Sequence, residues 1–464
     1  MDYSAANTNL WNIFIQMGVI AGILLLSNVL VRKSSLIRKS LIPTSVLAGF
    51  LLLALKTAGI LRIPPNFLEM VTYHGIAVGF IALSLRATER GGAGEGKGAG
   101  LKSGAVIIST YLVQAIVGLA ISLLLSYLWM PGLFKASGIL LPMAYGRGPG
   151  QANNVGITYE ALGFSGGQSF GLSLAAAGYL CACLVGVIYL NYLMRKGSLK
   201  RKEETVRSGS VTIDTFQDRG EIPLSESVDR LSIQVALVLL AYLCTYLVTL
   251  GLTSLIARVA PGATRTLSPL LWGFNFIIGS MLAMLIKAGL SYLRKSRVMT
   301  RQYQNNYLLS RISGLAFDLM IVAGIASIDF GDLSGLWVPF LLMAVAGGLV
   351  TFFYLRWLCG RVYPAYPEEG FLSMYGMLTG TISSGILLLR PIDPNFETPA
   401  ANNLVTGSSF GIVLGSPMLV FIGFAAESET MLYITVGLLF LYLTVLLWML
   451  LRRKAARARP EDAA

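Results

Sequence analysis

Long apolar runs recur along almost the whole chain and are separated by short polar segments. Most of the runs approach about 20 residues, which is the length of helix that crosses a bilayer. The pattern therefore predicts an all-α, polytopic membrane protein. The eleven spans that we expect cover residues 10–31, 41–60, 67–85, 104–130, 165–194, 231–257, 267–290, 312–328, 336–355, 401–424 and 431–451.

Two glycine-rich segments, Ala144–Gly156 and Met374–Ile386, interrupt the apolar pattern. Both carry Tyr-Gly near their start, place another glycine four residues after that glycine, and continue with small polar residues. Irregular backbone at membrane depth survives only when it is buried in protein or lines a wet cavity. Since matched interruptions in two halves of a chain point to the binding site of a secondary transporter, we predict re-entrant hairpins at residues 137–158 and 370–390.

The composition excludes a soluble protein, because 55% of the 464 residues are hydrophobic and only 13% are charged. The net charge of +13 by itself would suggest a nucleic-acid partner. Most of the 36 Lys and Arg residues fall instead in alternate loops, which is typical of the cytoplasmic loops of membrane proteins. We therefore expect an external N-terminus, a cytoplasmic C-terminus and no nucleic-acid partner.

The two halves of the chain repeat one order of elements, five spans with a hairpin between the fourth and the fifth. Residues 41–60 resemble residues 267–290, and Gly167–Gly171 matches Gly407–Gly411. Because five is an odd number, the two repeats have opposite orientations in the membrane. We expect a first inverted repeat at 1–194, a cytoplasmic linker at 195–230, a second repeat at 231–425, and an extra helix with a basic tail at 426–464.

Arg147 lies inside the first interruption, at membrane depth. An arginine at the centre of a bilayer costs about 2.5–3.5 kcal/mol on insertion scales, so it needs a partner or a wet site. One interpretation is a clamp for an anionic substrate, since the guanidinium presents a planar fork to a carboxylate. The alternative is an internal salt bridge, or an arginine bound to backbone carbonyls.

The small polar residues of both interruptions offer neutral oxygens and amides, which suit a hard cation such as Na⁺. Alternatively, they only permit close packing of helices. Arg390, which precedes Pro391, can also act as an anchor at the cytoplasmic interface. We predict substrate contacts from Arg147, Gly148, Gly150, Gln151, Asn153, Thr379, Ser383, Ser384 and Arg390, and cation contacts from Asn154, Thr381 and Asp318.

Asp318 is the one carboxylate well inside a predicted span, where it can bind a cation, carry a proton or pair with a buried arginine. We expect His74 to be a packed, hydrogen-bonding residue, and the four cysteines to form no disulfide or metal site. The segment Gly91–Gly98 nearly spells a phosphate-binding loop, but glycine follows Lys97 where Ser or Thr is required. No catalytic set stands out, so we expect no enzyme, cofactor or transition metal.

These segments resemble the sodium/glutamate symporter family over most of residues 10–425. The matching pieces are Ile42-Pro43 with Val46–Gly49, Ser84–Arg86, Gln114–Gly118 and Gly146–Ala152. Tyr145 and Tyr375 depart from the family, which has Gly-Gly-x-Gly in each hairpin, and Met377-Leu378 departs further. Residues 391–399 look like an insertion relative to the first hairpin.

The resemblance implies Na⁺-coupled import of glutamate or a related small carboxylate across the inner membrane of a bacterium. It also implies a homodimer and an elevator-like movement of a hairpin-bearing domain against a dimeric scaffold. The alternatives are a 2-hydroxycarboxylate or dicarboxylate carrier, or an ion channel built on paired re-entrant loops.

Overall fold

The computed structural model describes residues 7–35, 37, 41–86, 98–196, 230–259, 261, 264–273, 275–299, 301–393 and 398–452. Within these residues the regular elements are all helices, which confirms the all-α prediction. Ten of the described helices are long and apolar enough to span a membrane, so the chain is a multi-pass membrane protein. The predicted linker at 195–230 lies outside the described residues except for its ends, as does the glycine-rich segment up to Lys97.

The helices pack in two groups. In the first group α4 packs along α12, and we call it the α4–α12 unit. It comprises α1 (Thr8–Lys33), α3 (Thr44–Thr57), α4 (Pro65–Leu85), α9 (Arg230–Val259), α10 (Thr264–Gly273), α11 (Asn275–Lys295) and α12 (Asn306–Ala326).

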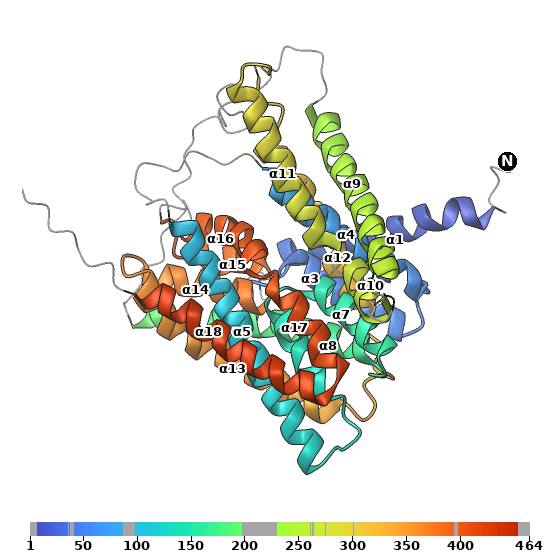
Figure 1. Ribbon diagram of the computed structural model, residues 1–464, viewed down its shortest axis with the longest axis vertical. Coiled ribbons are helices and arrows are strands. Elements are labelled where there is room, and N and C mark those ends of the chain that lie inside the picture. The colour runs from blue at the N-terminus through green and yellow to red at the C-terminus, as the bar shows by residue number, and fades with distance from the viewer. Residues whose placement is uncertain are drawn as a thin grey trace, which may run out of the picture.

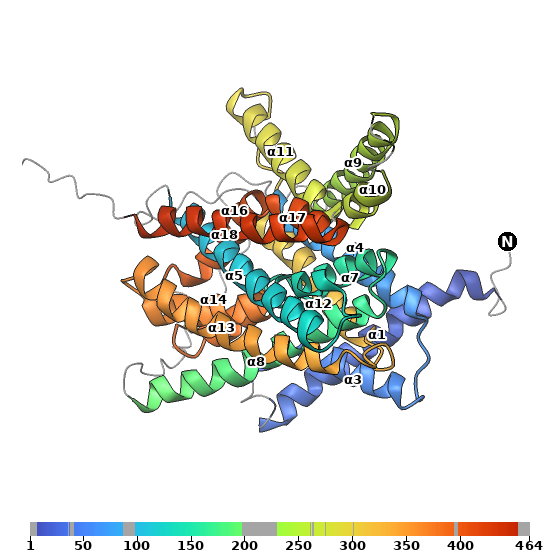
Figure 2. The ribbon, with the colours of Figure 1, turned by 60° about the horizontal axis from the view of Figure 1, so that its bottom comes forward.

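Glycines let the central pair of this unit approach closely. A Cβ atom at Gly79 of α4 would overlap the ring of Phe317 on α12, and one at Gly75 would press on Met320. The peripheral helices α9 and α11 project away from the rest of the molecule in both ribbon views (Figure 1) (Figure 2). The apolar side chains of α9 remain largely exposed, as expected of a helix that faces lipid or another subunit.

The second group, the α5–α13 unit, surrounds the long helix α5. Its close contacts also depend on glycine, since a Cβ atom at Gly118 of α5 would overlap the backbone of Gly138. The unit comprises α5 (Ala99–Leu128), the 3₁₀ helix η1 (Lys135–Ile139), α6 (Leu140–Tyr145), α7 (Pro149–Ala161), α8 (Gly167–Arg195), α13 (Trp337–Val362), α14 (Pro367–Thr379), α15 (Ile382–Leu389), α16 (Ala400–Leu414), α17 (Pro417–Glu427) and α18 (Glu429–Leu451).

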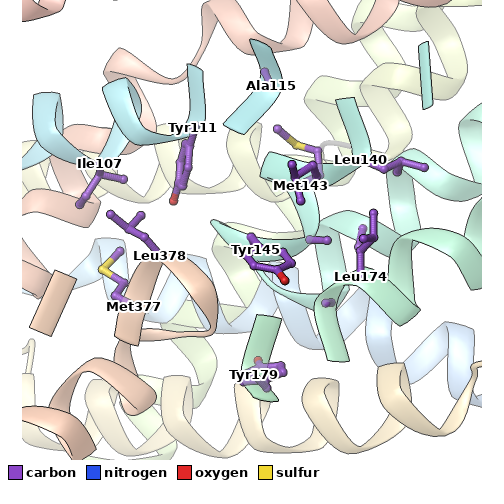
Figure 3. Packing of buried hydrophobic residues seen from close by; sticks show 14 of the residues in the cluster. Ile107, Tyr111, Ala115, Leu140, Met143, Tyr145, Leu174, Tyr179, Met377 and Leu378 are labelled. Carbon is purple, nitrogen blue, oxygen red and sulfur yellow. The ribbon is translucent and has the colours of Figure 1, made fainter. Parts of the chain in front are cut away.

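The additional C-terminal helix α18 runs beside α5 (Figure 1). A hydrogen bond between the Tyr127 and Tyr433 hydroxyl groups joins the two helices near one end, where an ion pair also links Lys135 of η1 to Glu429 of α18. Helix α18 is therefore part of the α5–α13 unit. Deeper in the unit, Ile107 and Tyr111 of α5 point toward Met377 and Leu378 of α14 (Figure 3).

Three predicted spans differ from the observed helices. The span at 41–60 contains α3, whose 14 residues extend about 21 Å, short of a hydrocarbon core of about 30 Å. The span at 267–290 is divided into α10 and α11. The span at 401–424 is divided into α16 and α17, because Pro417 has no backbone N–H to continue a helix.

The break between α10 and α11 leaves carbonyl groups that side chains from other helices satisfy. The Tyr73 hydroxyl donates to the carbonyl of Trp272 at 2.8 Å, and the Asn154 amide donates to the carbonyl of Gly273 at 2.5 Å. Asn275 donates in turn to the Tyr73 hydroxyl at 2.8 Å. Because a helix end cannot bond its last carbonyls internally, these side chains stabilise the break.

Candidate functional site

The two glycine-rich interruptions lie at helix breaks that contact each other. The first break separates α6 from α7 at residues 146–148, and the second separates α14 from α15 at residues 380–381. Gly148 has a φ of +79°, which favours glycine, and Pro149 then begins α7. A Cβ atom built at Gly148 would lie 3.6 Å from Cγ2 of Thr381 and 3.7 Å from the Gly380 carbonyl oxygen. More than 230 residues separate the two breaks in the sequence, and the fold brings them into contact.

A cavity of about 70 Å³ opens beside this junction. Both breaks line it, and so do helices α4 and α12 of the other unit, so the cavity lies where the two units meet. Its walls are formed by Phe80, Ile107, Tyr111, Gly146, Arg147, Phe317, Met320, Met377, Gly380, Thr381, Ile382, Ser408, Gly411 and Ile412.

Arg147 lines the cavity and is held against Tyr111. The central guanidinium carbon lies 5.1 Å from the centre of the Tyr111 ring, a cation–π arrangement. The Tyr111 hydroxyl donates a hydrogen bond of 2.8 Å to the carbonyl of Gly146, which fixes the ring beneath the guanidinium. A Cβ atom at Gly415 would collide with the guanidinium, so the small residue at that position makes room for it.

No described carboxylate forms an ion pair with Arg147, and its Nε atom is buried without a hydrogen-bond partner among the described residues. The internal salt bridge that the sequence left open therefore finds no acidic partner there. A buried cation without a counter-charge is costly. The arrangement suits an anion that enters the cavity and supplies the missing charge and acceptors.

Helix ends reinforce this preference for negative charge. Helices α7 and α15 both begin at the junction, at Pro149 and Ile382, and the first N–H groups of a helix have no partner within it. The positive ends of both helix dipoles thus lie near Arg147. Helix α14 ends at the same place, and its Met377 and Leu378 carbonyl groups accept from the Gly380 N–H and from the Gln114 amide.

The structure places Asn153 and Asn154 away from the cavity walls. Asn153 donates to the Asn154 side-chain oxygen at 3.3 Å and accepts from Gln168 at 2.9 Å. The Asn154 amide is engaged with Gly273 of α10, as described above. Both asparagines thus take part in contacts within the protein, and the Asn154 contact crosses from one unit to the other.

Other predicted residues lie in or next to the helices of the junction but do not line the cavity. Gln151 is fully buried, and neither atom of its amide has a hydrogen-bond partner among the described residues; the same holds for the buried hydroxyl of Ser384. Thr379 donates to the carbonyl of Tyr375 within its own helix at 2.7 Å. Gly150 packs against Met320 and Ile76. The side chain of Ser383 lies outside the described part of the chain.

The remaining candidates do not line the cavity. Asp318 lies on α12 beside Phe317, but it is within hydrogen-bonding range of Ser45 on α3. Arg390 is exposed at the end of α15, as expected of an anchor. His74 lies 2.6 Å from the Tyr242 hydroxyl, Nδ1 to oxygen, so it has the hydrogen bond that the sequence suggested, but its side chain is exposed and not packed in a core.

Several wall residues were not predicted from the sequence. Tyr111 lies in an uninterrupted apolar helix, and Phe80, Phe317 and Met320 come from helices with no local irregularity. Nothing in their spacing distinguishes them from lipid-facing or core residues. A signal existed for Ser408, a polar residue within the predicted span 401–424, and also for Gln114, a polar residue in the same span as Tyr111 that does not line the cavity.

Gln114 supports the second break and provides a test of its stability. Its amide donates to Thr351 at 2.8 Å and to the carbonyl of Leu378 at 3.0 Å, the latter near the end of α14. We expect Gln114→Leu to lower the free energy of unfolding by about 1–3 kcal/mol, because a buried carbonyl loses its donor. Denaturant or thermal unfolding in detergent measures this. Gln16→Leu is the control, since Gln16 bonds at 3.4 Å to Asn12 on its own helix; an equal loss in both variants would contradict the prediction.

No protein-family model matches the chain, and a search of curated proteins gives no match either.

Proposed function

We propose that this protein is a secondary transporter that moves a small carboxylate together with a cation. The observation that carries the proposal is the cavity at the junction of two helix breaks, which contains an arginine without an acidic partner among the described residues. Broken helices around a polar site are a recurring design of transporters, because their free termini bind ions and substrate.

The neighbour relations of the helices support two inverted repeats. In the first half α1 packs on α3, and in the second half α9 packs on α11. Likewise α3 packs on α12 and α11 packs on α4, while α5 contacts α6 and α13 contacts α14. The pairs α4–α12 and α5–α13 relate each half to the other. A twofold relation between residues 1–194 and 231–425 accounts for this pattern, with the two broken segments as opposed re-entrant hairpins.

The position of the cavity between the units supports an elevator-like movement. The α4–α12 unit would serve as the scaffold, and the α5–α13 unit would carry the substrate past it. Phe80, Phe317 and Met320 form the apolar wall of the cavity on the scaffold side. The hydrogen bond from Asn154 to Gly273 crosses the interface and would break during this movement.

Na⁺ is the coupling cation that we propose, as a cotransported substrate. The oxygen groups close to the junction are the Gly380 carbonyl and the hydroxyls of Tyr179, Thr381 and Ser384. Neutral oxygens of this kind suit a hard monovalent cation. Asp318 lies near Tyr179 and would add negative charge behind the site.

The proposed orientation in a bacterial inner membrane predicts which loops are reachable from outside. After the four cysteines are replaced, a single cysteine at Phe330 should react with an impermeant maleimide on intact cells. One at Val298 should react only after the membrane is permeabilised. Both side chains are exposed, at 47% and 72%, so access depends on the side of the membrane. Labelling in the reverse order would contradict an external N-terminus and a cytoplasmic C-terminus.

Reconstitution of the purified chain into liposomes tests the function. An inward Na⁺ gradient should drive saturable accumulation of a labelled carboxylate, and replacement of Na⁺ by K⁺ should abolish it. Glutamate is the substrate that the resemblance implies, with dicarboxylates as the alternative. Currents that flow without saturable uptake would identify a channel instead. Dimerisation, which the resemblance also implies, is checked by the mass of the reconstituted protein.

A further inference from the structure

The cavity beside Arg147 combines one charge with a largely apolar wall. Of its fourteen lining residues only Arg147 is charged. Apolar side chains reach it from α4, α5, α12, α14, α15 and α16, among them Phe317, Met320 and Ile412. This chemistry restricts the kind of carboxylate that the cavity can hold.

Two of the three hydroxyl groups of the wall already have partners, and the third, that of Thr381, has none among the described residues. Tyr111 donates to the Gly146 carbonyl, and Ser408 donates to the carbonyl of Leu404 at 2.6 Å. Thr381 faces the Tyr179 hydroxyl at the junction. A second carboxylate would find no second cation on this wall, and an ammonium group would find no acidic side chain. Charged groups without partners are strongly disfavoured in such surroundings.

The size of the cavity limits the substrate further. Its 70 Å³ is roughly half of the ~150 Å³ of an apolar cavity that holds benzene. In this conformation the space suits an aliphatic chain of a few carbon atoms beside Arg147, and the larger ring of an aromatic carboxylate fits less well.

We propose that the substrate is a short aliphatic monocarboxylate, whose carboxylate binds Arg147 and whose chain packs against Phe317, Met320 and Ile412. The inference rests on the proposed transport function and narrows its substrate class. It departs from glutamate and dicarboxylates, because each of them brings an additional charged group.

Thermal unfolding of the purified full-length protein with added ligands tests the substrate class, since a ligand that binds the folded state raises the unfolding midpoint. Isovalerate should raise the midpoint, whereas L-glutamate, succinate and the uncharged isovaleramide should not. Arg147→Gln should weaken isovalerate binding at least about tenfold. Ile412→Ala, which enlarges the cavity, should improve the affinity for phenylacetate about tenfold in a protein that still folds.

The outcomes separate the substrate class from the function. Stabilisation by L-glutamate or succinate that depends on Arg147, without an effect of isovalerate, would overturn the monocarboxylate assignment and leave carboxylate transport standing. Failure of all these carboxylates both to stabilise the protein and to accumulate in liposomes would overturn the transport proposal as well. Unchanged phenylacetate affinity in folded Ile412→Ala would remove the substrate chain from that wall.

Discussion

Replacement of Arg147 by Gln is expected to weaken binding of the proposed carboxylate substrate by about 10- to 100-fold. Hydrogen bonds to a charged group contribute about 1.5–3 kcal/mol, and each 1.4 kcal/mol corresponds to a factor of ten. The uncharged amide keeps some hydrogen-bonding capacity but cannot balance a carboxylate. The concentration dependence of uptake in liposomes measures the loss. Because removal of a buried charge also removes its desolvation cost, the variant should fold at least as well as the native chain.

The matched control for this experiment is Arg361→Gln. The Arg361 guanidinium also stacks on an aromatic ring, 4.6 Å from the centre of the Trp357 ring, but it is exposed at the end of α13. Uptake by this variant should equal that of the native protein. If Arg147→Gln transports an anion with native affinity, Arg147 does not bind the substrate, and the proposal loses the observation that carries it.

Gly118→Ala is expected to destabilise the protein by about 1–3 kcal/mol, although alanine is the better helix former. The added methyl group would overlap the backbone of Gly138, where α5 crosses η1. Backbone atoms on both sides leave no flexible side chain to move aside. The midpoint of thermal unfolding in detergent should fall, and α6, which begins just after η1 and leads to the first break, should lose its support.

Gly437→Ala in α18 shows what the same substitution does in open space. A Cβ atom at Gly437 would meet no atom within 4 Å, so this variant should be neutral or more stable by about 0.5–1 kcal/mol. An equal decrease in stability in both variants would mean that the added methyl group has the same effect at Gly118 as in open space at Gly437. The close approach of α5 and η1 would then not be a tight contact.

The sequence allowed the helices and both breaks to be predicted, because their determinants are local. Apolar runs identify helices by length, and the Gly148-Pro149 pair marks a helix start from its own backbone chemistry. The divisions at Pro417 and after Gly273 were missed, although proline at least carried a local signal. In the apolar run at 401–424 the hydropathy favoured one continuous span over a helix break at Pro417.

The site could be predicted only in part, because its walls depend on packing between distant helices. Arg147 and Thr381 stood out as polar groups in apolar runs, and both line the cavity. Phe317 and Met320 look like any other apolar residues of a span. Asn154 had the right chemistry for a ligand, but the fold directs its amide to Gly273. Which polar side chain faces a cavity is a tertiary property.

A single turn of α5 connects both helix breaks, through Tyr111 to the Gly146 carbonyl and through Gln114 to the Leu378 carbonyl. Residues three apart on a helix lie on the same face. This turn therefore holds the two broken segments at a fixed distance from each other. Whatever displacement the α5–α13 unit undergoes, the spacing between the breaks should stay constant. If the spacing between the breaks is constant, the proposed transporter would bind its substrate with the same selectivity from either side of the bilayer.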